Sequence, residues 1–433
     1  MTPGARLAAA IEVVADIEAR RRPAADALKD WGLSHRFAGS GDRAAIAGLV
    51  YDALRRRASS AYVMGSEAPR AVLLGMLRLE RKLDPAAIAR LADGARFAPE
   101  PLTEDERARL AAASLVGAPP EIAGDYPQWL DPHFARAFGE ERAAEGAALA
   151  SRAPLDLRVN ALKSDRDKAA AALVDLDPQP TRWAPLGLRI TLAADAKSPA
   201  IHAEPAFIKG LVEVQDEGSQ LAALLAGAKP GEQVVDLCAG AGGKTLALAA
   251  AMENRGQLYA TDLDKRRLAP IHARLDRAGV HNVQVRTPKS VGNELIDLAG
   301  RADLVLIDAP CTGTGAWRRN PDAKWRVRPG ALEVRRKEQA EVLDRAAALV
   351  KPGGRIAYVT CSVLAAENGD QVRSFLARHP GFAVVPPGEV ANALGERAYL
   401  FRRAVLMSEE GLQMTPRRTD TDGFFVSMLV RRS

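Results

Sequence analysis

The chain has 433 residues, which is too long for one ordinary domain, so we expect two or three domains. Hydrophobic residues make up 47% of the chain, enough for packed cores, which excludes general disorder. Its 60 Lys and Arg residues against 54 Asp and Glu give a net charge of +6, which permits nucleic-acid binding without establishing it.

The cysteines and the apolar runs indicate the cellular setting. Three cysteines are too few for a disulfide framework, which indicates a reducing compartment. Glu12 and Asp16 interrupt the apolar run at the N-terminus, which argues against a signal peptide, and no apolar stretch approaches membrane-spanning length. We expect a cytoplasmic protein, monomeric, with no membrane partner and no metal.

Helical periodicity and an Ala-, Leu- and Arg-rich composition predict an all-α domain over residues 1–140. The clearest helix is 42–57, where the spacing places a set of apolar residues on one face: Ile46, Leu49, Val50, Ala53 and Leu54. The basic triplets 20–22 and 55–57 would suit RNA phosphates, and they are equally well explained as ordinary helix ends.

The pattern changes over residues 141–210. Strand-like alternation at 155–160 and 187–192 flanks a helical stretch at 166–176, and prolines mark the joints. This pattern predicts a small α+β (RRM-like) module between the helical domain and a catalytic domain at 211–433.

A glycine-rich turn lies at the centre of the predicted catalytic domain. The apolar stretch before Asp236 predicts a buried parallel strand, residues 238–244 form the turn, and a helix follows. Glycines let the backbone approach a ligand, and a helix start offers free N–H groups. The spacing excludes a P-loop, which needs glycine where Cys238 stands, and a dinucleotide fingerprint, which needs glycine at Thr245. The turn is therefore typical of a site for a nucleoside-like cofactor without a pyrophosphate, such as S-adenosylmethionine.

Strands and helices alternate in the rest of this domain, which predicts a parallel, Rossmann-like sheet covered on both faces. Further strands are expected at 257–262, 283–286, 302–307 and 355–360. The run 423–430 is interpreted as a late antiparallel strand at the edge of the sheet. Asp262 ends the second strand, where doubly wound folds place the acid that binds ribose hydroxyls. The expected cofactor-binding residues are Cys238, Ala239, Gly240, Ala241, Gly242, Gly243, Lys244, Asp262 and Asp308.

Two cysteines follow strands of this sheet. Cys311 comes after Asp308-Ala-Pro, and Cys361 lies between Thr360 and Ser362. Ligands of open parallel sheets bind outside the carboxyl ends of the strands, so both thiols should lie at the same edge as the glycine turn. A lone cysteine at a strand end is usually a small buried residue, but two at one edge indicate a site.

These motifs resemble those of the Sun-type (Fmu) family of RNA cytosine-5 methyltransferases. The resemblance covers roughly residues 150–433 and includes the 238–244 turn, the two cysteine motifs and the segment 318–325. The segment 42–57 is similar to a helix of the RNA-binding fold named after the antitermination factor NusB. Together these resemblances imply the architecture of bacterial enzymes that methylate small-subunit (16S) ribosomal RNA. The implied domains are a NusB-like RNA-binding domain (1–140), the small α+β module (141–210) and a class I methyltransferase domain (211–433).

The chemistry of that family explains the residue set. Carbon 5 of cytosine is a poor nucleophile, and a thiolate that adds to carbon 6 activates it for methylation. The resemblance implies that Cys361 is this nucleophile, that Cys311 assists product release, and that Asp308 stabilises charge near the ring nitrogen. The residues alone do not rank the two thiols, since DNA cytosine methylases use a thiol from a Pro-Cys element.

Three positions leave alternatives open. Lys244 either orients acidic groups near the cofactor or faces solvent, and Cys238 either packs or contacts the cofactor through its backbone. The family commonly carries an acid after the third strand that contacts the adenine, and no acid stands in register at 286–293. We expect Ser290 or Asn293 to hold the adenine instead, or the cofactor to bind less tightly.

The basic segment after Cys311 is the expected contact with RNA. Arginines beside Trp317 and Trp325 suit phosphate contact with base stacking, and a solvated loop is the alternative. Because the target base sits in folded RNA, it must be unstacked or already exposed. The expected RNA-binding residues are Arg318, Arg319, Lys324 and Arg326, with Arg328 nearby.

Two rival functions share much of this sequence. An RNA-binding assembly factor with an inactive methyltransferase domain is disfavoured, because both cysteines, Asp308 and the glycine turn are all present. A cytosine-5 methyltransferase that acts on transfer RNA is compatible with the same motifs.

Overall fold

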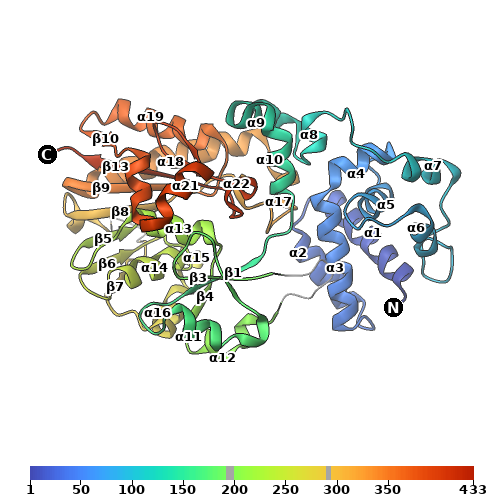
Figure 1. Cartoon of the computed structure of the whole chain (residues 1–433), viewed down its shortest axis with the longest axis horizontal. Coiled ribbons are helices and arrows are strands. Elements are labelled where there is room, and N and C mark those ends of the chain that lie inside the picture. Colours follow the sequence, from blue (N-terminus) through green and yellow to red (C-terminus); the bar gives the residue numbers. More distant parts are fainter. Residues whose placement is uncertain (192–198, 289–293) are drawn as a thin grey trace. The chain divides into compact units, whose positions relative to one another are not determined.

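The chain forms two compact units, whose elements are labelled in Figure 1. The computed structural model describes residues 1–191, 199–288 and 294–433. The first unit consists of Met1–Arg152 and Trp317–Arg328, and the second contains the other described residues. The chain therefore leaves the second unit after Ala316 and returns to it at Pro329.

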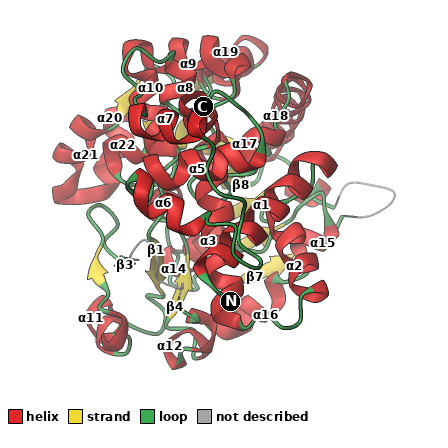
Figure 2. Cartoon of the chain, turned by 90° about the vertical axis from the view of Figure 1, so that its right-hand side faces the viewer, coloured by secondary structure: helices red, strands yellow, loops and turns green. Residues whose placement is uncertain are grey.

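The described residues of the first unit form helices and loops without strands, as the periodicity predicts (Figures 1 and 2). Local signals set the helix ends: the Thr2 hydroxyl accepts a hydrogen bond from the Ala5 N–H at 3.2 Å, and Thr103 and Glu106 form a capping box. The α-helices are α1 (Pro3–Arg20), α2 (Ala24–Ser34), α3 (Ser40–Arg55), α4 (Arg57–Met64), α5 (Pro69–Leu79), α6 (Pro85–Leu91), α7 (Glu104–Ala112), α8 (Pro120–Ala123), α9 (Asp131–Phe138), α10 (Arg142–Leu149) and α17 (Ala323–Arg326).

The helix expected at 42–57 is found as α3 and α4, which are separated by a break at Arg56. Its predicted apolar face packs into the core of the unit: Ile46, Val50, Ala53 and Leu54 are buried and Leu49 is partly buried. The adjoining arginines bind partners inside the unit. Arg56 donates to Glu80 at 2.7 Å, and Arg57 donates to Glu18 at 2.9 Å. These contacts favour the interpretation of the second basic triplet as a structural helix end.

A small antiparallel sheet begins the second unit, in the order β2-β3-β1-β4. Its elements are β1 (Leu155–Val159), α11 (Arg166–Ala171), β2 (Gln179–Pro180), β3 (Gly187–Ile190), α12 (Pro205–Ile208) and β4 (Val212–Val214). Buried side chains of β1, β3 and β4 share one core with α11 and α12. The sequence pattern placed 212–214 with the catalytic sheet, but this strand pairs with β1 and completes the small sheet.

The large sheet has nine strands, with eight in the order β11-β12-β13-β9-β8-β5-β6-β7 and β10 paired to β13 outside that path. The strands are β5 (Gln233–Asp236), β6 (Gln257–Ala260), β7 (Val283–Val285), β8 (Ala302–Asp308), β9 (Val350–Thr360), β10 (Phe382–Val384), β11 (Leu406–Met407), β12 (Leu412–Met414) and β13 (Phe424–Arg431). Strands β5 to β9 run parallel to their neighbours within this group, which is the Rossmann-like arrangement that the sequence predicts.

Helices cover both faces of this sheet. Adjacent residues of β5 point to opposite faces, and Val234 and Val235 belong to separate hydrophobic cores. The α-helices are α13 (Glu217–Ala226), α14 (Gly243–Ala251), α15 (Lys265–Leu268), α16 (Ile271–Ala278), α18 (Pro329–Leu349), α19 (Gly369–Arg378), α20 (Pro387–Val390), α21 (Ala398–Ala404) and α22 (Pro416–Thr419). Among the described residues, no helix combines the length and the apolar character needed to cross a bilayer.

The last strand corrects one expectation. β13 is antiparallel to β9, as predicted, but it lies inside the sheet, with β12 and β11 beyond it. The residues of β13 are buried from Phe424 to Leu429 on both faces of the strand. Continuous burial on both faces is typical of an interior strand, which explains why the edge assignment was wrong.

Candidate active site

The glycine turn connects β5 to α14. Gly240 and Gly242 have φ angles of 50° and 88°, a left-handed conformation that residues with side chains rarely adopt. A Cβ atom at Gly242 would lie 2.6 Å from Cγ1 of Ile271, so this position also has no space for a side chain. The turn therefore forms a cradle of bare backbone in front of the α14 N-terminus, which fits the nucleoside-like cofactor inferred from the sequence.

Asp262 lies just beyond β6 and contacts this turn directly. One carboxylate oxygen accepts the Gly240 N–H at 2.9 Å, and the other accepts the Asp264 N–H at 2.9 Å. The side chain is 5% exposed. Backbone contacts thus fix the carboxylate at the mouth of the turn, where the sequence places the acid for ribose hydroxyls. Ser290 and Asn293, the residues expected near the adenine, lie outside the described part of the chain.

Burial shifts two further groups under the turn toward their neutral forms. Burial raises the pKa of the Asp236 carboxyl to about 7, although its oxygen accepts a 2.7 Å hydrogen bond from the Thr245 hydroxyl. Burial also raises the pKa of the Cys238 thiol, and the neighbouring carboxylates add to this effect. A protonated thiol is a poor nucleophile, so Cys238 suits packing or backbone contact and not attack.

Lys244, in the first turn of α14, faces Asp308 at the end of β8. Its Nζ donates to a carboxylate oxygen at 2.7 Å, and its side chain is 7% exposed against 35% for Asp308. The ammonium also lies 5.1 Å from the ring centre of Phe424. The solvent-facing alternative for Lys244 is therefore wrong, and the lysine orients a carboxylate that remains accessible.

Cys311 and Cys361 lie side by side, in the loops that follow β8 and β9. Their sulfur atoms are 3.3 Å apart, both thiols are free, and both residues are partly exposed. The hydrogen bond with Cys361, together with burial, raises the pKa of Cys311. The shared sheet edge expected from the sequence thus brings the two sulfur atoms into contact.

Glu367, which was not predicted from the sequence, joins the two cysteine loops. Its carboxylate is fully buried and accepts from the Thr312 N–H at 2.8 Å and from the Thr312 and Ser362 hydroxyls at 2.5 Å each. Gln339 donates to the same carboxylate at 3.1 Å and to the Pro310 carbonyl at 2.9 Å. The sequence does carry a signal for this residue. An acid so soon after the Thr-Cys-Ser motif must lie near the end of the strand, and therefore near the two cysteines.

The expected RNA-binding residues do not share one surface. Lys324 is fully buried and donates to the backbone oxygens of Arg55 and Asp125 at 2.7 Å each, and Arg318 is 2% exposed. These two residues therefore do not reach RNA phosphates, and their expected role is corrected to a structural one. Arg319 is partly exposed, and Arg326 is exposed beside Asp322, at 2.9 Å.

The buried lysine gives a testable dependence of stability on pH. Burial lowers the pKa of Lys324 to about 7 from an ordinary value of 10.5, so between these values only the unfolded chain binds the proton. Both states bind it below pH 7 and neither binds it above 10.5. We expect the wild type to gain up to about 1.4 kcal/mol per pH unit within this window, relative to Lys324→Met. Unfolding midpoints of both proteins measure the gain, and a difference that stays constant with pH would contradict it.

The sequence and the fold both match known proteins. Residues 222–430 match the family described as 16S rRNA methyltransferase RsmB/F, and residues 126–197 match its ferredoxin-like domain. The chain is 33% identical to ribosomal RNA small subunit methyltransferase B of Sodalis glossinidius, covering 71% of this chain and 66% of that protein. It is 32% identical to the protein of the same name from Vibrio vulnificus, covering 72% and 68%.

A solved structure extends the similarity to nearly the whole chain. The crystal structure of PH0851 is similar with a TM-score of 0.71 at 25% sequence identity, covering 99% of each chain. In sequence, the chain spans just under two thirds of the length of the first curated relatives, at 66%. It belongs to the 16S rRNA methyltransferase RsmB/F family, whose members use S-adenosylmethionine.

Proposed function

We propose that this protein transfers a methyl group to carbon 5 of a cytosine in small-subunit ribosomal RNA, through a covalent adduct between Cys361 and carbon 6. The observation that carries this proposal is the pair of free thiols 3.3 Å apart beside the Lys244–Asp308 pair. A methyl transfer to an amino group would need no thiol. The names of the relatives, ribosomal RNA small subunit methyltransferase B, support the substrate class.

The reaction proceeds by addition of a thiolate, methyl transfer and elimination. The Cys361 thiolate forms a bond to carbon 6, while Asp308 gives a proton to the ring nitrogen, where negative charge develops, and takes it back on elimination. Carbon 5 then takes the methyl group that S-adenosylmethionine supplies when bound. A base removes the carbon 5 proton, the bond between sulfur and carbon 6 breaks, and Cys361 leaves as a thiolate. Lys244 holds Asp308 in place throughout by its 2.7 Å contact.

The two thiols receive different roles. The raised pKa of Cys311 keeps that sulfur protonated at neutral pH, 3.3 Å from the sulfur of Cys361. A thiol that holds its proton is a poor first nucleophile and a suitable acid-base partner for the release of the product. This property of Cys311 supports Cys361 as the attacking residue.

RNA recognition is assigned to the helical part of the chain. We infer that residues 1–140 form a NusB-like RNA-binding domain, followed by the α+β module (141–210) and the methyltransferase domain (211–433). The absence of strands from the described residues of the first unit supports the first assignment, and the match to a ferredoxin-like domain supports the second.

Cofactor binding provides a prediction for Asp262. Asp262→Ala is expected to weaken S-adenosylmethionine binding about 10- to 100-fold, because the ribose hydroxyls lose a charged hydrogen-bond acceptor. Calorimetry with the purified protein measures the affinity. Asp264→Ala is the matched control, since that exposed neighbouring carboxylate caps Arg266 and does not contact the turn. Unchanged affinity in Asp262→Ala would remove this residue from the site.

Bisulfite sequencing tests the whole proposal. Total RNA from a deletion strain is expected to lack one methylated cytosine of small-subunit ribosomal RNA that its parent carries. Loss of a methylated cytosine from transfer RNA instead would select that alternative substrate. Identical methylation in both strains would favour the inactive assembly factor.

A further inference from the structure

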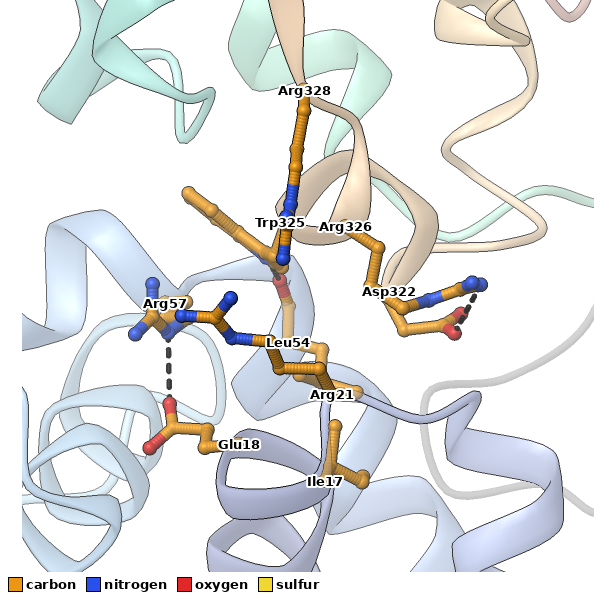
Figure 3. A pocket seen from close by; sticks show the side chains of 9 residues that line it. All are labelled: Ile17, Glu18, Arg21, Leu54, Arg57, Asp322, Trp325, Arg326 and Arg328. Atoms are coloured by element: carbon orange, nitrogen blue, oxygen red, sulfur yellow. Dashed lines mark hydrogen bonds and ion pairs between the residues drawn. The ribbon is translucent and has the colours of Figure 1, made fainter. Parts of the chain in front are cut away.

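The first unit contains a basic pocket that the proposed chemistry does not use. It has a volume of about 410 Å³, and all of its lining residues belong to the first unit (Figure 3). Four arginines and two carboxylates give it a formal charge of +2: Arg21, Arg57, Arg326, Arg328, Glu18 and Asp322. We call this hollow the arginine pocket.

The two carboxylates are already paired, which leaves two arginines unneutralised. Glu18 lies 2.9 Å from Arg57, and Asp322 lies 2.9 Å from Arg326. Arg21 and Arg328 are exposed and have no ion pair or hydrogen bond to any residue that the structure describes. Two free guanidinium groups at one hollow attract an anion, and their planar donor geometry matches phosphate.

The backbone of Arg21 is a second, independent sign. This residue ends α1 in the left-handed conformation, with a φ of 50° and a ψ of 41°. Glycine or asparagine usually occupies such a position, because other side chains are strained there. The strained backbone directs a long cationic side chain into the pocket, and Figure 3 shows Arg21, Arg57 and Arg328 gathered around Trp325.

One wall of the arginine pocket is less polar than the side that carries the arginines. The Trp325 indole N–H donates to the Leu54 carbonyl at 2.6 Å, so it has no hydrogen bond left to offer. Its ring, over which Arg57 lies at 5.3 Å, forms a wall together with the side chains of Ile17 and Leu54. A ligand with a phosphate group and a flat, less polar part matches both surfaces, and a nucleotide has this composition.

We propose that the arginine pocket binds a nucleotide of the substrate RNA, with Arg21 and Arg328 on its backbone phosphates and the nucleoside against Trp325. This inference rests on the proposed function, which supplies the RNA. It narrows RNA recognition to one hollow of the first unit. The phosphate contacts expected from Lys324 and Arg318, which are buried, are assigned in part to Arg21, a residue far from them in the sequence.

The test compares two double variants that remove the same charge. Arg21→Ala with Arg328→Ala is expected to weaken binding of a fluorescently labelled small-subunit ribosomal RNA transcript by about tenfold for each arginine. The slope of log affinity against log salt should fall by about one for each phosphate that the variant no longer binds. The control is Arg36→Ala with Arg90→Ala, because both arginines are exposed, lie in the same unit and have no partner among the described residues. Anisotropy titrations at several salt concentrations measure both quantities.

Arg21→Gly tests whether a loss of RNA affinity comes from the missing side chain or from a loss of stability. Glycine accepts the left-handed conformation, so this variant should keep or raise the unfolding midpoint while its RNA affinity falls. An equal fall in affinity in the pocket variant and the control would overturn the pocket and leave diffuse electrostatic attraction. Unchanged RNA affinity in the pocket variant would point to another occupant, such as an acidic protein segment, and would also overturn it. Failure of the proposed function is distinct, because then the wild type does not methylate the transcript, whatever its affinity for it.

Discussion

Cys361→Ala is expected to lower the rate of methyl transfer by about four orders of magnitude or more and to form no covalent adduct with RNA. This variant has no sulfur to add at carbon 6, so carbon 5 is never activated. Binding of S-adenosylmethionine and of RNA should persist, because both depend on other parts of the chain. The defect therefore falls on the first chemical step.

Cys311→Ala should fail at the last step of the reaction, the elimination that releases the RNA. Its Cys361 can still attack and the ring can still be methylated, but elimination slows and the RNA stays attached. Both variants fail to turn over, yet they give opposite signatures on a denaturing gel. The 3.3 Å separation of the two sulfur atoms is what allows one thiol to serve the adduct formed by the other.

Denaturing electrophoresis with labelled RNA and S-adenosylmethionine separates these cases. We expect a slow-migrating band with Cys311→Ala, no such band with Cys361→Ala, and no stable band when the cofactor is omitted, since unmethylated addition is reversible. A band in Cys361→Ala and none in Cys311→Ala would reverse the two roles. Bands in neither variant, beside an active wild type, would contradict the elimination role of Cys311.

Glu367→Gln is expected to lower kcat by about 100-fold and stability by about 2–4 kcal/mol, with little change in the affinity for S-adenosylmethionine. Each oxygen of the carboxylate accepts two hydrogen bonds, so an amide nitrogen in place of one oxygen leaves two buried donors without an acceptor. The donors come from both cysteine loops, through Thr312 and Ser362. Without these hydrogen bonds the two sulfur atoms should drift apart, which affects the chemical step more than binding.

The matched control is Glu341→Gln, the same substitution at an exposed position of α18. Steady-state kinetics and thermal unfolding of both variants separate a positioning role from a purely structural one. If Glu367→Gln is less stable but keeps the wild-type kcat, Glu367 supports the fold alone. A parallel fall in cofactor affinity would show that the damage extends to the glycine turn.

The sequence was most informative where local pattern decides the structure. Strand ends followed by motif residues predicted that Cys311 and Cys361 share one edge, since parallel strands bring their carboxyl ends together. The sequence did not show that β4 leaves the catalytic sheet or that β13 lies inside the large one, because strand pairing depends on partners distant in the chain. Lys324 was counted among surface cations, as charged residues usually are, and only packing shows that it is buried.

The excursion of residues 317–328 into the helical unit has a consequence for synthesis on the ribosome. The unit is discontinuous, so its first 152 residues emerge long before the segment that completes their packing. At roughly 5–20 residues per second, the delay is about 10 to 30 s. During that interval the carbonyls of Leu54, Arg55 and Asp125 lack the donors that Trp325 and Lys324 later supply. The N-terminal helices thus reach their final state only after the first four strands of the large sheet, β5 to β8, have been translated.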